Sequence, residues 1–274
     1  MLKTVLLALV FTFGCAEGAT VSFRSAHALV VDENSGEVLF EKDAATAAPI
    51  ASMTKLMTAM VVLDAQLPPD EQIRIERADL DTLKHSRGGV PVGAVLPRST
   101  LLELALLASD NHAAAALART YPGGNEAFLA AVQRKIGELA LEDTVLEEPT
   151  GLSRANHATA HDMVKILKAA ATYPDIGRAT SQRSDAVSVN GRRRVYRNTN
   201  GLVGRPGWDI TLSKTGFTNE AGRCLTMRLQ SAGRSVLVVL MGAVKPSQRT
   251  RDALSIQRWL GSADAALAGV SRGE

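Results

Sequence analysis

Ser52-Met53-Thr54-Lys55, followed by Leu56-Met57-Thr58-Ala59-Met60-Val61-Val62-Leu63, opens a predicted helix in the first third of the chain. Apolar residues recur along it at helical spacing, which predicts a buried amphipathic helix. Ser52 and Lys55 are three positions apart, so they lie about 60° apart around the helix axis and on the same side. The Lys55 amine can therefore reach the Ser52 hydroxyl.

This pair has the chemistry of a nucleophile and its base. A serine hydroxyl is a weak nucleophile unless a neighbouring base takes its proton, and a lysine is a base only when it is deprotonated. The pKa of Lys55 must therefore fall by roughly 3 units from ~10.4, through burial and cationic neighbours. Ser-x-x-Lys also arises where a serine merely caps a helix, so the interpretation needs support from elsewhere in the chain.

The N-terminus has the layout of a secretory signal peptide, which we assign to residues 1–19. Lys3 precedes an uncharged apolar run that is too short to span a bilayer, and small residues allow cleavage after Ala16 or after Gly18. Lipidation at Cys15 is the alternative, although the residues before it match the lipoprotein pattern poorly. If Cys15 is removed, Cys224 is the only remaining cysteine, and its alternating apolar context favours a buried thiol over a reactive one.

The charge of the chain is only weakly basic. The net charge is +3 and the pI is near 9.0, less than a nucleic-acid-binding protein would need. The sharpest basic cluster is Arg192-Arg193-Arg194 with Arg197, after an Asn190-Gly191 hairpin turn. We interpret it as a solvated strand pair and leave binding to an anionic polymer outside the cytoplasm open. No segment after the signal peptide has the length and apolarity of a membrane anchor.

The predicted elements follow the order strands, helices, strands and a closing helix. Capping boxes at Thr100/Glu103 and Thr159/Asp162 predict two helix starts. The sequence predicts an α/β (α+β) fold: an antiparallel sheet made from both chain ends, flanked by helices, with an inserted all-helical sub-domain. The predicted strands are Ala26–Asp32, Glu37–Lys42, Val187–Val189, Arg194–Tyr196, Ile210–Gly216, Arg223–Leu229 and Ser235–Met241, and the closing helix is Arg251–Leu260.

Two further motifs support the Ser52 pair. Ser109-Asp110-Asn111 lies between predicted helices, and Lys214-Thr215-Gly216 ends a predicted strand. The ordered trio Ser-x-x-Lys, Ser-x-Asn and Lys-Thr-Gly is the signature of penicillin-binding proteins and class A β-lactamases. With Tyr121–Gly124, Arg197–Asn200 and Lys214–Cys224, the chain resembles the low-molecular-mass penicillin-binding proteins, which are serine D-alanyl-D-alanine peptidases. It resembles their endopeptidases of the penicillin-binding protein 7 type most, over nearly all of the mature chain.

The resemblance implies a β-lactamase/DD-peptidase-like fold and a role for each motif residue. Ser52 attacks the carbonyl of a D-Ala-D-X peptide to form an acyl-enzyme, and Lys55 takes its proton. Ser109 and Lys214 pass a proton to the leaving amine. We expect each of the two lysines to depress the pKa of the other, since both face one cavity.

The resemblance also implies how the substrate is held. Asn111 binds the substrate amide, and Lys214, Thr215 and Gly216 present a strand edge and polar groups to the peptide. The backbone N–H groups of Ser52 and Phe217 form the oxyanion hole. The implied partners are peptidoglycan peptides and, as covalent inhibitors, β-lactam antibiotics. No cofactor, metal or nucleic acid is implied.

The expected organisation is one peptidase domain over residues 20–265, with its sheet-containing part at 20–70 and 160–265, a helical insert at 71–159 and a polar tail at 266–274. The expected location is the periplasm, without a transmembrane anchor after signal cleavage. Related carboxypeptidases usually have Asn-Arg-Asn where this chain has Asn198-Thr199-Asn200, and that arginine helps to bind the terminal carboxylate of the substrate. The difference favours cutting cross-links over trimming free stem peptides.

Four other functions are weighed as alternatives. A β-lactamase needs a glutamate that activates water. Glu147 and Glu148 lie in a plausible region, but we interpret both as loop charges. His157 and His161 have metal-like spacing without the glutamate of a His-Glu-x-x-His motif. No Gly-x-Ser-x-Gly nucleophile elbow occurs in the sequence, which argues against the catalytic triad of an α/β-hydrolase. A non-catalytic wall-binding relative would be expected to lack Lys55 or Lys214, and both are present.

Overall fold

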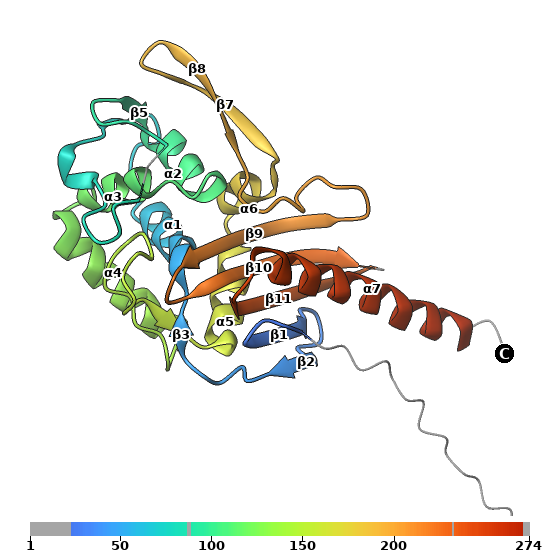
Figure 1. Ribbon diagram of the computed structural model, residues 1–274. Coiled ribbons are helices and arrows are strands. Elements are labelled where there is room, and N and C mark those ends of the chain that lie inside the picture. Colours follow the sequence, from blue (N-terminus) through green and yellow to red (C-terminus); the bar gives the residue numbers. More distant parts are fainter. Residues whose placement is uncertain (1–22, 87–88, 232, 271–274) are drawn as a thin grey trace, which may run out of the picture.

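A five-stranded antiparallel sheet stands beside a group of helices in the computed structural model, which describes residues 23–86, 89–231 and 233–270 (Figure 1). The first and last parts of the chain meet in this sheet, as the sequence predicts. The predicted signal peptide at 1–19 lies outside the described residues. The strands follow the order β2 (Val38–Lys42), β1 (His27–Asp32), β11 (Arg234–Ala243), β10 (Gly222–Ser231) and β9 (Asp209–Thr218).

The central strand β11 is buried on both faces, which explains its uninterrupted apolar sequence. Its alternate residues belong to two different clusters of the core. Val236, Val238 and Leu240 pack with Ala253 and Ile256 of the closing helix α7 (Pro246–Val270). The residues between them, Leu237, Val239 and Met241, pack with the helices on the other side of the sheet.

Helix α7 also holds the beginning of the described chain. The Asp252 carboxylate accepts hydrogen bonds of 2.7 Å from both the backbone N–H and the hydroxyl of Ser25. The helix runs to Val270 rather than ending at Leu260 as predicted. The tail predicted at 266–274 therefore begins inside it, and residues 271–274 lie outside the described part of the chain.

The remaining helices surround α1 (Lys55–Asp64), whose residues from Lys55 to Val62 are all buried. The prediction of an amphipathic helix is wrong in this respect. Helices and the sheet enclose α1, so no face of it is left for solvent, apart from its last residues. The surrounding helices are α2 (Arg98–Leu107), α3 (Asn111–Arg119), α4 (Gly124–Glu138), α5 (Ala160–Ala170) and α6 (Pro174–Ser181).

Two details of the helical insert differ from the prediction. The insert is not entirely helical, because β4 (Gln72–Arg74) pairs with β5 (Val95–Pro97) inside it. Helix α2 follows this strand pair directly and has Pro97 at its N-cap, so the capping box predicted at Thr100 does not form. Proline has no backbone N–H to satisfy, and it leads the chain straight from strand to helix. Another short pair joins β3 (Ala48–Pro49) to β6 (His157–Ala158).

The other predicted helix start is confirmed. Thr159 is the N-cap of α5, and its hydroxyl accepts a hydrogen bond of 3.1 Å from the backbone N–H of Asp162. The Asp162 carboxylate does not complete the box, because it accepts instead from the backbone N–H of Asp143 and the hydroxyl of Thr144. The cap therefore fastens the start of α5 to the preceding loop.

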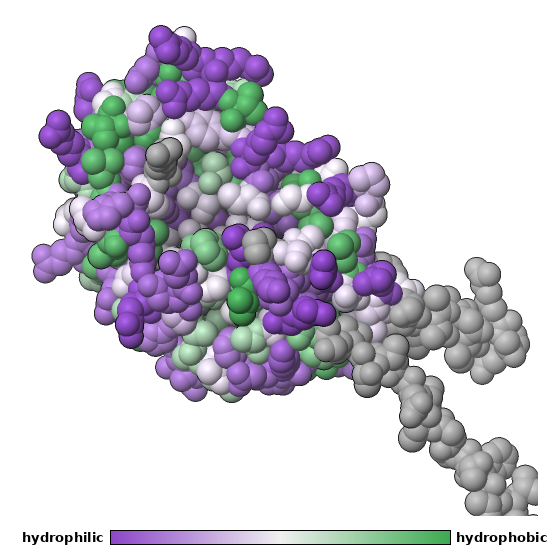
Figure 2. All heavy atoms as spheres, viewed as in Figure 1, coloured by the Kyte–Doolittle hydropathy of each residue, from purple (hydrophilic) through white to green (hydrophobic). Residues whose placement is uncertain are grey.

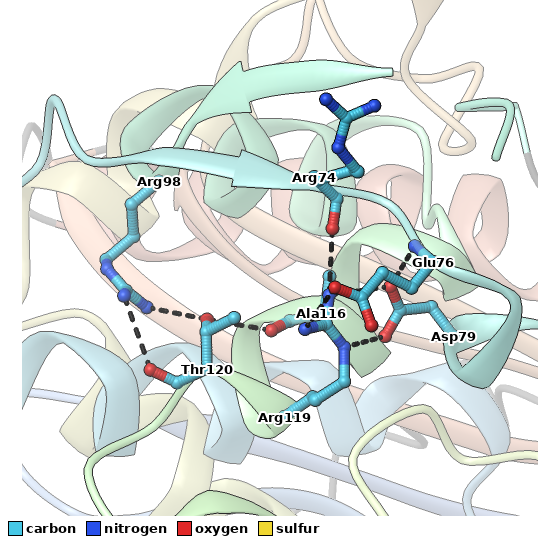
Figure 3. A network of polar contacts seen from close by, with 7 residues as sticks. All are labelled: Arg74, Glu76, Asp79, Arg98, Ala116, Arg119 and Thr120. Atoms are coloured by element: carbon cyan, nitrogen blue, oxygen red, sulfur yellow. Dashed lines mark hydrogen bonds and ion pairs between the residues drawn. The ribbon is translucent and has the colours of Figure 1, made fainter. Parts of the chain in front are cut away.

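A polar network fixes the C-terminal end of α3, the helix that begins next to the predicted site (Figure 3). Arg119 donates hydrogen bonds of 2.8 and 3.0 Å to the two carboxylate oxygens of Asp79 and one of 2.8 Å to the carbonyl of Arg74. Arg98, which is 4% exposed, donates to the Thr120 hydroxyl at 3.2 Å. Held at this end, α3 can present its first residues rigidly.

Candidate active site

Ser52, the predicted nucleophile, lies in a short 3₁₀-helix, Ala51–Thr54, which leads directly into α1 at Lys55. In a 3₁₀-helix residues i and i+3 are eclipsed, so Lys55 stands directly over Ser52. The Lys55 Nζ lies 3.0 Å from the Ser52 Oγ, which brings the predicted pair together. Ala51 has a φ of +47°, a strained value for a non-glycine residue of the kind that accumulates at functional sites.

The partners of Lys55 show how it can act as a base. Its Nζ donates to the side-chain oxygen of Asn111 at 2.7 Å and to the carbonyl of Thr150 at 2.6 Å, besides its contact with Ser52. A neutral amine has only two hydrogens and one lone pair. Because the two fixed oxygens cannot donate, they take both hydrogens, and the lone pair is left to accept the proton of the Ser52 hydroxyl.

Glu148 organises the loop that supplies the Thr150 carbonyl. Its carboxylate accepts from the backbone N–H of Thr150 at 2.7 Å and of Gly151 at 2.6 Å. It also accepts from the Thr150 hydroxyl and from the side-chain amide of Asn156. Glu148 is thus a charge within a loop, as interpreted from the sequence, and it also holds that loop in place through these hydrogen bonds. The sequence could not show that several donors of one loop converge on this carboxylate.

Burial and nearby charges shift the pKa of the Lys55 amine. Burial lowers its pKa to about 8, while the negative charges of Glu148, Asp110 and Asp81 act in the opposite direction. Lys55 is 1% exposed. The shift has the direction that a base requires.

We expect Glu148→Gln to slow the acylation of Ser52 by about 10- to 100-fold, since the loop and with it Lys55 would be misplaced. The wild-type rate should rise with pH through about 8, because only the neutral amine accepts the proton. Without the Glu148 charge the ammonium is less stabilised, so the midpoint should move to lower pH. The rate of labelling by a fluorescent penicillin from about pH 6 to about pH 10 measures both effects.

The matched control is Glu147→Gln, because Glu147 is the adjacent residue and is exposed. It should leave both the rate and the midpoint unchanged. A Glu148→Gln profile with the wild-type midpoint would show that this carboxylate does not act on Lys55.

The second lysine and serine meet on the opposite side of the site. The Lys214 Nζ donates to the Ser109 Oγ at 2.8 Å and to the carbonyl of Thr215 at 3.1 Å. Ser109, like Ala51, has a left-handed backbone, with φ of +58°. The next residue, Asp110, is the N-cap of α3, and its carboxylate accepts from the backbone N–H of Ala113. The cap therefore fixes the strained turn that carries Ser109.

The two lysines do not lower each other's pKa equally, contrary to the mutual effect that the sequence predicts. Burial and the positive charges of Lys55 and Arg249 lower the pKa of Lys214 well below its usual range. Lys55 has three carboxylates in its neighbourhood, whereas Lys214 faces another cation in Arg249. The charges around Lys55 thus oppose the lowering of its pKa, whereas those around Lys214 add to it. The depression of the Lys55 pKa comes from burial and not from a Lys214 ammonium.

Strand β9 approaches the backbone of Ile50 and Ser52 closely, which requires Gly216. A Cβ atom at this position would lie 2.7 Å from the carbonyl oxygen of Ile50 and 3.2 Å from the backbone nitrogen of Ser52. The glycine thus lets the strand bring Phe217, the next residue, beside the Ser52 backbone. This placement fits the oxyanion hole that the resemblance implies.

A cavity of about 270 Å³ opens beside these groups and contains two arginines that the sequence analysis did not assign. Its lining residues are Ser52, Ser109, Thr199, Thr215, Gly216, Phe217, Arg223 and Arg249. Arg223 lies over the Phe217 ring at 4.3 Å, and its Nε is buried with no partner among the described residues. Arg249 follows β11 by several residues and has no motif around it, so no sequence signal marks it.

An ion pair joins the two walls of the site. Lys84, in the loop before α2, pairs with Glu220 in the turn between β9 and β10. The hydrogen bond from Lys84 lowers the pKa of Glu220 to about 2. Nearby, the hydroxyl of Ser86 accepts from the side-chain amide of Asn111 at 2.8 Å, which leaves one amide hydrogen of Asn111 for a ligand.

The other residues considered in the sequence lie elsewhere. The His161 ring contacts Glu41 at 3.0 Å and the His157 ring contacts the carbonyl of Ala155. In the part of the chain that is described, no three His, Cys, Asp or Glu side chains cluster as metal ligands. Cys224 is fully buried, and burial raises its pKa to about 11, so the prediction of a buried thiol is confirmed.

Comparisons with known proteins agree with this geometry. The family model described as D-alanyl-D-alanine carboxypeptidase matches residues 15–245. The D-alanyl-D-alanine endopeptidase of Escherichia coli is 41% identical over 238 residues, covering 86% of this chain and 77% of the relative. That of Pseudomonas aeruginosa is 42% identical with the same coverage.

Solved structures show the same relationship. The Streptomyces K15 DD-transpeptidase superimposes with a TM-score of 0.81 at 25% identity, covering 88% of this chain and 98% of that one. Its fold therefore extends over nearly all of the described residues. On the strength of the family match and of the identity to the endopeptidases, the chain belongs to the D-alanyl-D-alanine carboxypeptidase family of serine peptidases.

Proposed function

We propose that the protein is a periplasmic peptidase that hydrolyses D-Ala-D-X bonds in peptidoglycan, with Ser52 as the nucleophile and Lys55 as its base. The observation that carries this is the Lys55 amine, whose two hydrogens are held by Asn111 and Thr150 and whose third partner is the Ser52 Oγ at 3.0 Å. The match to curated endopeptidases supports cross-links as the main substrate.

The reaction proceeds through an acyl-enzyme. Lys55 takes the proton of Ser52 as its Oγ adds to the carbonyl of the D-Ala residue, and the backbone N–H groups of Ser52 and Phe217 stabilise the oxyanion. The leaving amine takes a proton through Ser109 and Lys214, which are hydrogen-bonded to each other. Water then hydrolyses the ester and frees Ser52.

The arginines of the cavity fit the group that leaves. The residue after the scissile bond carries a carboxylate next to the departing nitrogen, and Arg223 and Arg249 supply positive charge beside Ser52. Thr199 stands where related carboxypeptidases have an arginine, and its hydroxyl is hydrogen-bonded to that of Thr215 at 2.7 Å. The cavity therefore retains counter-charge without that arginine, which allows both cross-links and free stem peptides.

A β-lactamase is disfavoured by the contacts of Glu148. Both of its oxygens accept hydrogen bonds from its own loop, so it is not free to activate water.

A helix long and apolar enough to cross a membrane does not occur among the described residues.

Labelled penicillin tests the proposal. We expect stable labelling of a peptide containing Ser52, found by mass spectrometry, and no labelling of Ser52→Ala. Purified sacculi digested with the enzyme should release uncross-linked muropeptides, with activity that survives EDTA. Sustained turnover of a chromogenic cephalosporin would instead identify a β-lactamase. Loss of activity in EDTA would identify a metal enzyme, and an active Ser52→Ala would rule out the nucleophile.

A further inference from the structure

The hairpin of β7 (Ser184–Val189) and β8 (Arg192–Arg197) projects from the body of the molecule (Figure 1). Four of its residues are arginines and one, Asp185, is acidic. This surplus of three positive charges equals the net charge of +3 of the whole chain. The rest of the protein is therefore electrically balanced, and the hairpin carries the excess.

The hairpin arginines are exposed and lack acidic partners. Arg192, Arg193, Arg194 and Arg197 are all exposed, and none makes an ion pair with any acid in the described residues. Asp185 is directed to Glu103 instead, and burial together with the Asp185 charge raises the pKa of Glu103. Figure 2 shows hydrophilic side chains gathered over the outer end of the hairpin. Protein surfaces usually intersperse charges of both signs, so this one is unusual.

A cavity of about 390 Å³ lies at the base of the hairpin and is lined by hydrogen-bond donors. Arg183 and Arg197 contribute guanidinium groups, and none of the described residues that line it is acidic. Asn200 also lines it and is 4% exposed. Its Oδ1 accepts from the backbone N–H of Leu202, whereas its Nδ2 has no partner among the described residues. Such a set of donors suits an oxyanion.

Neighbouring residues fix the shape of this cavity. Gly204 has a φ of +69°, and a Cβ there would lie 2.4 Å from the Cγ and Cδ of Arg183, so the glycine makes room for the arginine stem. Asn198 fixes the adjoining segment by donating to the carbonyls of Thr180 at 2.9 Å and Gln182 at 3.0 Å. The guanidinium groups are thus presented by a fastened backbone.

This cavity adjoins the catalytic one. Thr199 lines the cavity that contains Ser52, whereas its neighbours Asn198 and Asn200 line the cavity at the hairpin base. A bend at Thr199, held by the hydrogen bond of 2.8 Å from the Asn200 backbone N–H to the Asn198 side-chain oxygen, therefore separates the two cavities. A polymer that places one bond at Ser52 can reach the arginines with a neighbouring group.

We propose that the cavity of Arg183, Arg197 and Asn200, continued by the arginines along β8, binds carboxylate groups of the peptidoglycan polymer outside the catalytic cavity. This inference rests on the proposed substrate, whose peptides carry free carboxylates. The site holds the enzyme on the wall while Ser52 acts on one of many linked peptides. The cationic hairpin also attracts the anionic polymer over long range, which speeds their association. Added salt screens this attraction and weakens the effect.

Sedimentation with purified sacculi tests the site without catalysis, when all proteins carry Ser52→Ala. We expect Arg183→Gln with Arg197→Gln to weaken binding about tenfold or more at low salt, and to make it less sensitive to added salt. The pair Arg77→Gln with Arg154→Gln removes the same charge from exposed residues elsewhere and should have no effect. Arg192→Gln with Arg193→Gln should weaken binding less than the cavity pair.

The same assay identifies the ligand. Amidation of the sacculus carboxylates with carbodiimide and glycinamide should abolish binding, whereas hydrofluoric acid, which removes phosphodiester-linked polymers, should leave it unchanged. With Ser52 restored, the cavity variants should raise KM for sacculi, while acylation by penicillin should change by less than about twofold, since that ligand occupies only the catalytic cavity.

Several outcomes would overturn the inference. Equal binding by the cavity pair and the control pair would show that the arginines do not dock the polymer. Binding that survives amidation, is lost after hydrofluoric acid, or goes preferentially to anionic phospholipid vesicles would assign a different ligand. These outcomes are separate from failure of the proposed function, which would appear as absent penicillin labelling in a protein with an intact hairpin.

Discussion

Lys55→Met is expected to slow the acylation of Ser52 by penicillin by about 10²- to 10⁴-fold, the usual contribution of a general base. Methionine has a similar length but no lone pair that can take the Ser52 proton. Lys55 is 1% exposed, and taking an amine out of water opposes folding, which offsets the loss of its hydrogen bonds to Asn111 and Thr150. The thermal unfolding midpoint should therefore change little.

Labelling kinetics and differential scanning calorimetry measure these two effects separately. Lys168→Met is the control, because Lys168 is an exposed lysine on α5, and it should leave both rate and midpoint unchanged. If Lys55→Met acylates within about tenfold of the wild-type rate, the proton of Ser52 leaves by another route and Lys55 is not the base.

Gly151→Ala is expected to destabilise the fold by at least about 3 kcal/mol, because the new methyl group has no space. Gly151 has a φ of +83°, and a Cβ there would lie 1.9 Å from the carbonyl oxygen of Ala51 and 2.8 Å from the backbone nitrogen of Ser52. Both are backbone atoms, which cannot rotate away. The new methyl group must therefore displace Ser52 or the loop that holds Lys55. Urea unfolding and penicillin labelling should both register the change.

Gly36→Ala separates the clash from the backbone strain. Gly36 has a similar φ of +76°, and a Cβ there would have no heavy atom within 4 Å. Gly36→Ala should therefore lower the free energy of unfolding only by the roughly 1–2 kcal/mol that a left-handed alanine costs. It should have no effect on penicillin labelling. A Gly151→Ala protein as stable as Gly36→Ala would mean that the loop moves freely away from Ser52.

Much of the fold follows from local patterns in the sequence. The apolar run of β11 and the turns around it predict the central strands, because a strand buried on both faces has no room for polar residues. Thr159 marks the start of α5 since its hydroxyl satisfies a helix N–H that lies nearby in the chain. The pairing of Ser52 with Lys55 also needs only one turn of helix.

The parts that the sequence did not reveal depend on contacts between distant residues. The Thr150 carbonyl that orients Lys55 lies far along the chain, and nothing in the local sequence links the two. The electrostatic surroundings of the two lysines differ, with three carboxylates near Lys55 and the Arg249 cation near Lys214. Those neighbours come together only in the folded chain, so motif spacing could place the lysines but not their charges.

The position of β1 in the sheet affects how the chain is made. β1 pairs with β11 along its whole length, from His27 opposite Met241 to Asp32 opposite Val236. A ribosome releases β1 early and β11 only near the end of synthesis, so the nascent chain cannot close its sheet during translation. The central sheet can therefore form only once β11 has been synthesised and is free to pair with β1.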